Sequence, residues 1–297
     1  MRSLFHPKAQ PLPLAASLLA LGAFYWGLFR LQLPDANSVA LTPEKSQELQ
    51  DESAVMRRFG KWNRALAPTL RLHAAYPENH IYIGQLAEIY DHMGRYADES
   101  AMWEAYVEHA PRPIEACPQI GQAYEKQGKE TRAIAAFEKC LTFEANNPDS
   151  LFYLARALER SGQTDRAASL YQLGVAASPG YSDLETGLAR MRLRQGKPEE
   201  ARDLAAAVVR QSPNNTDALL VLGLACQRLG DRTGARNYLE RGVKLADTYV
   251  DFHLALANMA EQDANLDSAI EHYQRVADLD KTNTEAARRL ALLRRAR

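Results

Sequence analysis

Residues 148–181 read PDSLFYLARALERSGQTDRAASLYQLGVAASPGY, a stretch of 34 residues from which the whole chain can be understood. Its apolar side chains recur every three or four residues in two stripes on either side of Gly162, namely Leu151, Leu154, Ala155 and Leu158, then Ala167, Leu170, Tyr171 and Gly174. This spacing predicts two amphipathic helices. Gly162 stands where the first helix must end, because a residue without a Cβ adopts the left-handed backbone of a helix C-terminus at little cost.

The same pattern recurs along the chain with a period of 34 residues. Three columns share this period: glycines at Gly60, Gly94, Gly128, Gly162, Gly196 and Gly230, alanines at Ala65, Ala133, Ala167, Ala201, Ala235 and Ala269, and prolines at Pro77, Pro111, Pro179 and Pro213. Only Glu99 breaks the alanine column. A fixed period of this length is typical of a helical solenoid. It gives seven repeats, 46–79, 80–113, 114–147, 148–181, 182–215, 216–249 and 250–283, numbered 1 to 7, and then a last helix at 284–297.

These columns resemble the tetratricopeptide repeat family, a helix–turn–helix unit of the same period. The small residue at position eight of that unit is matched by Ala87, Gly121, Ala155, Ala189, Gly223 and Ala257. The large residue of its second helix is matched by Trp103, Phe137, Tyr171, Leu239 and Tyr273, with Ala205 as the exception. The resemblance implies an all-α solenoid of about seven repeats over 46–283 and a capping helix at 284–297. It weakens at the ends, where Ser53 occupies position eight, Pro68 should kink or shorten a helix, and Ala264 replaces the glycine.

The amino-terminal segment lies outside the repeats and has a different, strongly apolar composition. Residues 12–33 read LPLAASLLALGAFYWGLFRLQL and carry one charge, Arg30. About 20 helical residues match the ~30 Å hydrocarbon core of a bilayer, so a transmembrane helix is predicted at 12–33. The alternative is a cleaved signal peptide, but the nearest small-residue cleavage site, Ser38-Val39-Ala40, lies beyond a charged gap. We therefore interpret 12–33 as a signal anchor, followed by a linker at 34–45.

The flanking charges predict the orientation of this anchor. Arg2 and Lys8 precede the helix without any acidic residue, whereas acidic residues dilute the basic ones after it. The positive-inside rule then keeps the tail at 1–11 in the cytoplasm and exports the rest. In a bacterium, the chain would be a single-pass inner-membrane protein with its repeats in the periplasm.

Composition and motifs limit the function further. The formal net charge of -1 gives no overall attraction to nucleic acid, and 46% hydrophobic residues indicate a folded chain. Catalytic and nucleotide-binding motifs are missing and the seven histidines lack metal-ligand spacing, so we expect no enzyme activity, cofactor, metal or small-molecule substrate. The three cysteines fall in apolar helical stretches and are interpreted as buried packing residues. A bridge between Cys117 and Cys140 stays open if the repeats lie in an oxidising compartment.

The family resemblance implies a superhelix whose concave face is lined by the first helix of each repeat. On that face we predict a partner-binding surface made of Phe152, Arg156, Arg160, Arg190, Arg194, Leu220 and Leu224. Arginines four residues apart share a helix face and could bind carboxylates of a partner bidentately. The alternative is that they are surface arginines paired with local acids such as Glu159 and Asp183.

The sequence therefore predicts a membrane-tethered scaffold or adaptor for protein–protein interactions in the assembly or organisation of a bacterial cell-envelope complex. Its partners would be other membrane or envelope subunits. Two alternatives stay open: a permanent structural subunit of a membrane machine, and a periplasmic chaperone that holds client proteins during assembly.

Overall fold

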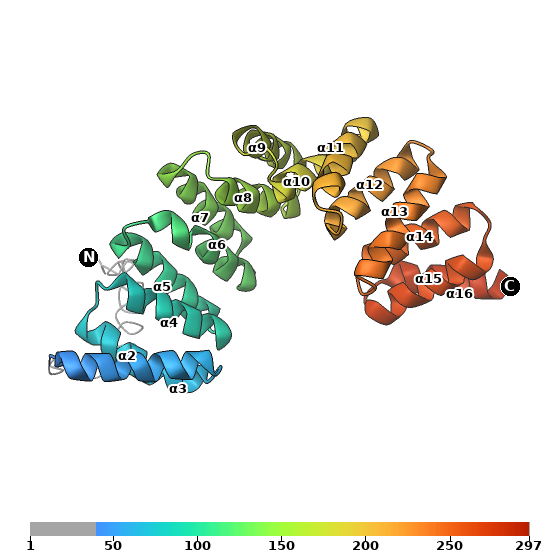
Figure 1. The fold of residues 1–297 in the computed structure, drawn as a ribbon. Coiled ribbons are helices and arrows are strands. Elements are labelled where there is room, and N and C mark those ends of the chain that lie inside the picture. Colours follow the sequence, from blue (N-terminus) through green and yellow to red (C-terminus); the bar gives the residue numbers. More distant parts are fainter. Residues whose placement is uncertain (1–39, 297) are drawn as a thin grey trace, which may run out of the picture. The chain divides into compact units, whose positions relative to one another are not determined.

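The computed structural model describes residues 40–296, which contain helices and turns but no strand (Figure 1). The predicted transmembrane helix at 12–33, the tail at 1–11 and the linker up to residue 39 lie outside the described residues. Between residues 40 and 296, no helix combines the length and the apolar character needed to span a bilayer. The chain divides between Met93 and Gly94 into two compact units.

The N-terminal unit holds α2 (Pro43–Arg58), α3 (Trp62–Ala75) and α4 (His80–His92). Helix α2 begins three residues before the expected start of repeat 1, because Thr42 accepts a hydrogen bond from the backbone N–H of Lys45 at 3.2 Å and Pro43 fits the first turn. The expected shortening at Pro68 is wrong. Helix α3 runs through it for 14 residues, with the proline ring buried in the core.

Ser53, unexpected at position eight of repeat 1, has a partner of matching chemistry. Its hydroxyl lies 2.7 Å from that of Thr69, and both side chains are buried. Thr69 in turn donates to the carbonyl of Ala65 at 2.8 Å. A satisfied polar pair therefore replaces the contact between a small and a large residue that later repeats make.

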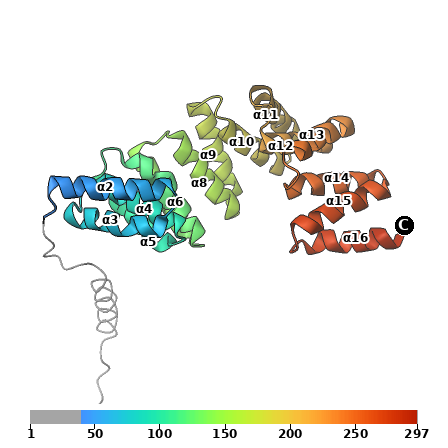
Figure 2. The same cartoon turned by 60° about the horizontal axis from the view of Figure 1, so that its bottom comes forward.

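The C-terminal unit continues the helix pairs to the end of the described chain (Figure 2). Its elements are α5 (Tyr96–His109), η1 (Pro113–Ala116), α6 (Cys117–Lys126), α7 (Glu130–Phe143), α8 (Pro148–Arg160), α9 (Thr164–Ala177), α10 (Ser182–Arg194), α11 (Pro198–Gln211), α12 (Thr216–Arg228), α13 (Arg232–Leu245), α14 (Val250–Gln262), α15 (Leu266–Leu279) and α16 (Thr284–Ala296). Within this unit the helices α6 to α15 follow one another as pairs, and α16 packs on α15.

The repeats stack through their first helices. Helices α6, α8, α10, α12 and α14 contact one another in series, and each second helix packs between the first helix of its own repeat and that of the next. In Figure 1, α6, α8 and α10 form one layer, and α7, α9 and α11 form the other. Large side chains such as Phe137 and Tyr171 are fully buried between the layers. The first helices therefore share one continuous face.

The glycine column has the predicted backbone. All six of its members have φ between 67° and 80°, the left-handed region in which a side chain is unfavourable. Ala264, which replaces the seventh glycine, has φ 54° and is the one non-glycine residue with positive φ between residues 40 and 296. The turn of repeat 7 is therefore kept in spite of its Cβ.

A disulfide joins α6 to α7 within repeat 3. It links Cys117 and Cys140, whose Cα atoms lie 5.7 Å apart. Cys226 is a buried free thiol whose pKa is raised by burial. The interpretation of the cysteines as packing residues therefore holds for Cys226, while the bridge that the sequence left open is present.

Candidate functional site

The predicted arginines lie on two neighbouring first helices. Arg156 and Arg160 are on α8, and Arg190 and Arg194 occupy the same positions on α10, one repeat later. Because α8 packs beside α10, the two pairs come together in register. We call these four residues the arginine ladder.

Each pair of the ladder binds one buried glutamate of the preceding repeat. Glu125 on α6 lies 3.5 Å from Arg156 and also contacts Arg160. Glu159 on α8 lies 2.9 Å from Nε of Arg190 and 3.2 Å from Nη2 of Arg194. The side chains of the two glutamates are 13% and 8% exposed, so the arginines neutralise carboxylates that could not stay charged alone at this depth.

Within each pair of the ladder, the second arginine is more exposed than the first. Arg160 and Arg194 keep about half of their side-chain surface exposed, 47% and 51%, while Arg190 keeps 29%. Burial alone would lower the pKa of Arg190, but the Glu159 carboxylate and the Tyr171 hydroxyl outweigh it and raise that pKa. Arg156 and Arg190 therefore stabilise the packing of the helices, and Arg160 and Arg194 leave positive charge exposed to solvent.

Aromatic groups extend the ladder on α8. The guanidinium of Arg156 lies 5.4 Å from the ring centroid of Phe152 and 5.1 Å from that of Tyr153, within the range of cation–π attraction. Phe152 is half-buried and packs against the core of repeats 3 to 5. One part of its surface therefore remains accessible to solvent.

The two predicted leucines lie on α12, the next first helix. Leu220 and Leu224 are half-buried against a core formed by repeats 5 to 7. Leu224 occupies the place that Arg156 and Arg190 hold in the two preceding repeats. The column of Arg156 and Arg190 therefore ends at α12, whereas Arg228 continues the column of Arg160 and Arg194 there and is exposed.

The surface predicted from the sequence omitted a row of aspartates near the N-termini of the same helices. Asp149, Asp183, Asp217 and Asp251 recur with the repeat period, a signal that was available in the sequence. Tyr249 donates to Asp217 at 3.0 Å, and Tyr181 donates to Asp149. Burial and the charge of Asp217 raise the pKa of Asp183 despite the opposing effect of Arg156. The first-helix face thus carries acidic groups at one end and basic groups at the other.

Asp183 forms no ion pair with a ladder arginine among the residues that the structure describes. Glu159 does form such ion pairs, and its partners are the arginines of the next repeat. The pairing with local acids that the sequence left open is therefore correct for Glu159, and Glu125 plays the same role one repeat earlier. Two carboxylates face four guanidinium groups, so the ladder keeps an excess of positive charge.

Comparison with known protein families identifies the repeats. Two family models match, each described as a tetratricopeptide repeat, one over residues 125–191 and 192–259 and the other over residues 253–287. Together these segments cover more than half of the chain. A search among curated protein sequences gives no match.

Solved structures share the fold at low sequence identity. A tetratricopeptide repeat protein from Parabacteroides merdae superposes with a TM-score of 0.67 at 11% identity, over 84% of this chain and 99% of its own. Pseudomonas aeruginosa pilF gives a TM-score of 0.60 at 16% identity, over 72% and 98%.

The third similar structure is that of a larger protein. A chain of the APC/C hetero-tetramer Cut9–Hcn1 gives a TM-score of 0.65 at 16% identity over 81% of this chain, which spans about half of that chain, 48%. Together with the matches to the family models, these similarities fix the fold and the repeat type. The chain belongs to the tetratricopeptide repeat family.

Proposed function

We propose that the chain is a membrane-tethered scaffold that binds other proteins through the first-helix face of repeats 4 to 6. The arginine ladder is the observation that carries this proposal, because Glu125 and Glu159 neutralise only part of its charge and Arg160 and Arg194 remain exposed. Tetratricopeptide repeats suggest a protein-interaction scaffold. A chain of this fold belongs to the hetero-tetramer Cut9–Hcn1, which gives a precedent for a place in a multi-chain assembly.

The chemistry of the face indicates the kind of segment it would bind. The exposed guanidinium groups of Arg160 and Arg194 suit carboxylates of the partner. The aspartate row at the opposite end of the same helices suits lysine or arginine, and the half-buried Phe152 and Leu220 between them suit apolar side chains. A partner segment with acidic and basic ends would thus fit in one direction only, because electrostatic complementarity sets specificity.

Two features support a place in the bacterial cell envelope. The apolar segment at 12–33 has the length of a membrane anchor, and its flanking charges favour export of the repeats. The bridge between Cys117 and Cys140 suits an oxidising compartment such as the periplasm, since disulfides are rare in the cytosol. Tethering would raise the effective concentration of the scaffold near other membrane subunits during the assembly of an envelope complex.

Affinity capture of the full-length chain from solubilised membranes tests the protein-binding part. The informative variant is Arg160→Gln with Arg194→Gln, because Arg156 and Arg190 remain to neutralise the two buried glutamates. The matched control is Arg210→Gln with Lys244→Gln, which removes the same charge from exposed positions on second helices. We expect a protein partner to be captured by the wild type and the control and lost in the ladder variant. Equal capture by all three would contradict the proposed face.

A topology measurement tests the tether and the compartment. An alkaline phosphatase that is active only outside the cytoplasm would be fused after Arg297 and assayed in intact bacterial cells. Activity in the membrane fraction is the expected result. Loss of activity, with normal amounts of fusion protein, would place the repeats in the cytoplasm and remove the envelope part of the proposal, while the capture experiment would still report on the ladder.

A further inference from the structure

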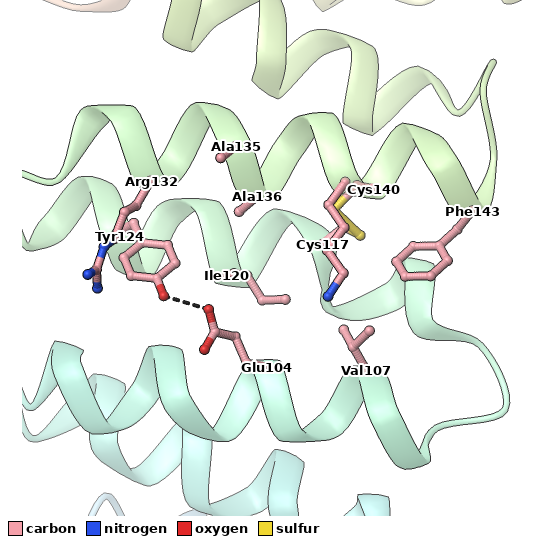
Figure 3. Close-up of a pocket in the computed structure, with 11 residues that line it drawn as sticks. Glu104, Val107, Cys117, Ile120, Tyr124, Arg132, Ala135, Ala136, Cys140 and Phe143 are labelled. Atoms are coloured by element: carbon pink, nitrogen blue, oxygen red, sulfur yellow. Dashed lines mark hydrogen bonds between the residues drawn. A yellow bond between two sulfur atoms is a disulfide. The ribbon is translucent and has the colours of Figure 1, made fainter. Parts of the chain in front are cut away.

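A cavity of about 320 Å³ lies between α5, α6 and α7 (Figure 3). Its walls are Val107 from α5, Ile120 from α6, and Ala136 and Phe143 from α7, together with the disulfide between Cys117 and Cys140. A dry apolar cavity of ~150 Å³ can hold benzene, so this one has room for a large side chain. Because second helices form two of its walls, it is a different surface from the arginine ladder.

The cavity exists because repeat 3 lacks a side chain that later repeats have. One and two repeats after Ala136 stand Leu170 and Leu204, followed by Tyr238 and His272. Leu170 and Leu204 are half-buried and pack against the cores of their repeats. Ala136 fills this place with a single methyl group. The space is therefore a local property of repeat 3 and not of the fold.

Two exposed cations flank the cavity on α7. Arg132, Ala136, Lys139 and Phe143 follow one another at intervals of four, three and four residues, so they share one face of that helix. Within the described chain, neither Arg132 nor Lys139 has a carboxylate at ion-pair distance. The alanine between them permits close approach of another backbone. The cavity is thus an apolar hole between two unneutralised positive charges.

The one carboxylate that lines the cavity is already engaged. Glu104 accepts a hydrogen bond of 2.5 Å from the hydroxyl of Tyr124, as Figure 3 shows. Burial and Glu104 together raise the pKa of Tyr124, so this hydroxyl keeps its proton and remains a donor. The guanidinium of Arg132 lies 5.8 Å from the centroid of the Tyr124 ring. The lining therefore carries one carboxylate, Glu104, and two cations, Arg132 and Lys139, which leaves a net positive charge for a ligand.

We propose that this cavity is a docking site for a protein segment that inserts one aromatic or branched aliphatic side chain and carries acidic residues one helical turn to either side of it. The inserted group fills the apolar hole, and the acidic residues pair with Arg132 and Lys139. Seven residues separate these cations, which is about 10 Å along a helix and matches two turns of a partner helix on α7. With this site, the chain holds a partner on each of its two helix layers.

The test uses the full-length, oxidised chain and two fluorescein-labelled peptides of about 15 residues. Both peptides have one central Phe. The acidic probe has Glu four residues before and three residues after it, and the basic probe has Lys at the same two places. Fluorescence anisotropy should show the acidic probe binding at least about tenfold more tightly than the basic one. Equal binding of the two probes, or no binding of the acidic probe up to ~1 mM, overturns the proposal.

Two variants locate the binding. Ala136→Leu introduces the residue that the next two repeats carry and fills the cavity, and Arg132→Glu with Lys139→Glu reverses the charge at its mouth. Each should weaken binding of the acidic probe by at least about tenfold. The control Arg210→Glu with Lys244→Glu makes the same change in net charge on other second helices and should leave binding within about twofold.

Three further outcomes separate binding in the cavity from misfolding, from a net-charge effect and from binding at the arginine ladder. Should Ala136→Leu lose its helical circular dichroism, the charge-reversed variant, which changes only exposed side chains, still decides. If the control weakens binding as much as the charge-reversed variant does, the probe responds to net charge and the site is rejected. If Arg160→Gln with Arg194→Gln abolishes binding and Ala136→Leu does not, the probe binds the arginine ladder and the cavity is again rejected.

Discussion

The Nε atom of Arg190 lies 2.9 Å from Oε1 of Glu159, a residue of the preceding repeat whose side chain is 8% exposed. The hydroxyl of Tyr171 donates to the other oxygen of the same carboxylate at 3.1 Å. Arg156 and Glu125 repeat the relationship one unit earlier. The arginines that make the face basic thus also join α6 to α8 and α8 to α10 through their ion pairs with Glu125 and Glu159.

Glu159→Ala should lower the free energy of unfolding by about 2 kcal/mol, because Arg190 would then lie largely buried without a counter-ion. Arg194→Gln should cost less than about 0.5 kcal/mol, since this side chain is half exposed and Arg190 still neutralises the glutamate. Urea unfolding followed by circular dichroism gives both values. Similar losses of unfolding free energy for the two variants would contradict this difference between the buried Glu159 and the exposed Arg194.

Reducing the disulfide should destabilise repeat 3 in particular. The bridge closes a loop with a sequence separation of 23 residues, for which loop-closure entropy predicts about 3 kcal/mol. Hydrogen exchange compared with and without a reductant should show lost protection concentrated in α6 and α7, because each repeat contacts mainly its neighbours. Uniform loss of protection along the array would contradict this local role.

Acidification should destabilise repeat 7. Nδ1 of His253 lies 3.1 Å from Nδ1 of His272, and Nε2 of His253 lies 2.9 Å from the carbonyl of Asp247. Burial, followed by the effect of His253, lowers the pKa of His272 below 6.5, although Glu271 and Glu240 oppose this. The folded state then binds fewer protons than the unfolded state, so stability should fall as the pH drops through about 6.5.

Urea unfolding at pH 7.5 and at pH 5.5, compared between the wild type and His272→Asn, measures this effect. The difference between the two pH values should be smaller in the variant, since the group with the lowered pKa is gone. Arg275 also pairs with Asp247 in both proteins, so it does not account for a difference between them. An unchanged pH dependence would show that His272 is not the responsible group.

Ala264→Gly should stabilise the chain. Ala264 has φ 54°, where a Cβ costs about 1–2 kcal/mol, and the greater freedom of glycine in the unfolded chain offsets part of that. The expected gain is about 0.5–1 kcal/mol in urea unfolding. The reverse change, Gly128→Ala, places a Cβ at φ 68° in repeat 3 and should cost a similar amount. A loss of stability with Ala264→Gly would contradict the assigned strain.

The period of 34 residues was enough to predict the helix pairs, the left-handed glycine turns and the register of the arginines. These features depend on local backbone preferences and on spacing, which a single sequence displays directly. The choice of Glu125 and Glu159 as the partners of these arginines could not be predicted in this way. It depends on which side chains of two stacked helices reach each other, and several acids stood near the arginines in the sequence.

The cavity beside Ala136 was missed because it results from a missing side chain. Comparing Ala136 with Leu170 and Leu204 shows the missing side chain, but only once that column is known to pack against the repeat cores. The shortening expected at Pro68 was wrong for a related reason, since its buried ring contributes packing that a propensity argument ignores. Both cases concern tertiary contacts that periodicity alone does not reveal.

The central claim is that the first-helix face of the array contacts a protein partner in the cell. The most direct test places a photoreactive benzoylphenylalanine at Leu220 on that face and, as a control, at Leu173 on α9, which is 45% exposed. Irradiation of intact cells followed by mass spectrometry should yield a covalent adduct with a defined envelope protein from position 220, and that adduct should be absent from position 173. The same adducts from both positions, or none from position 220, would contradict the claim.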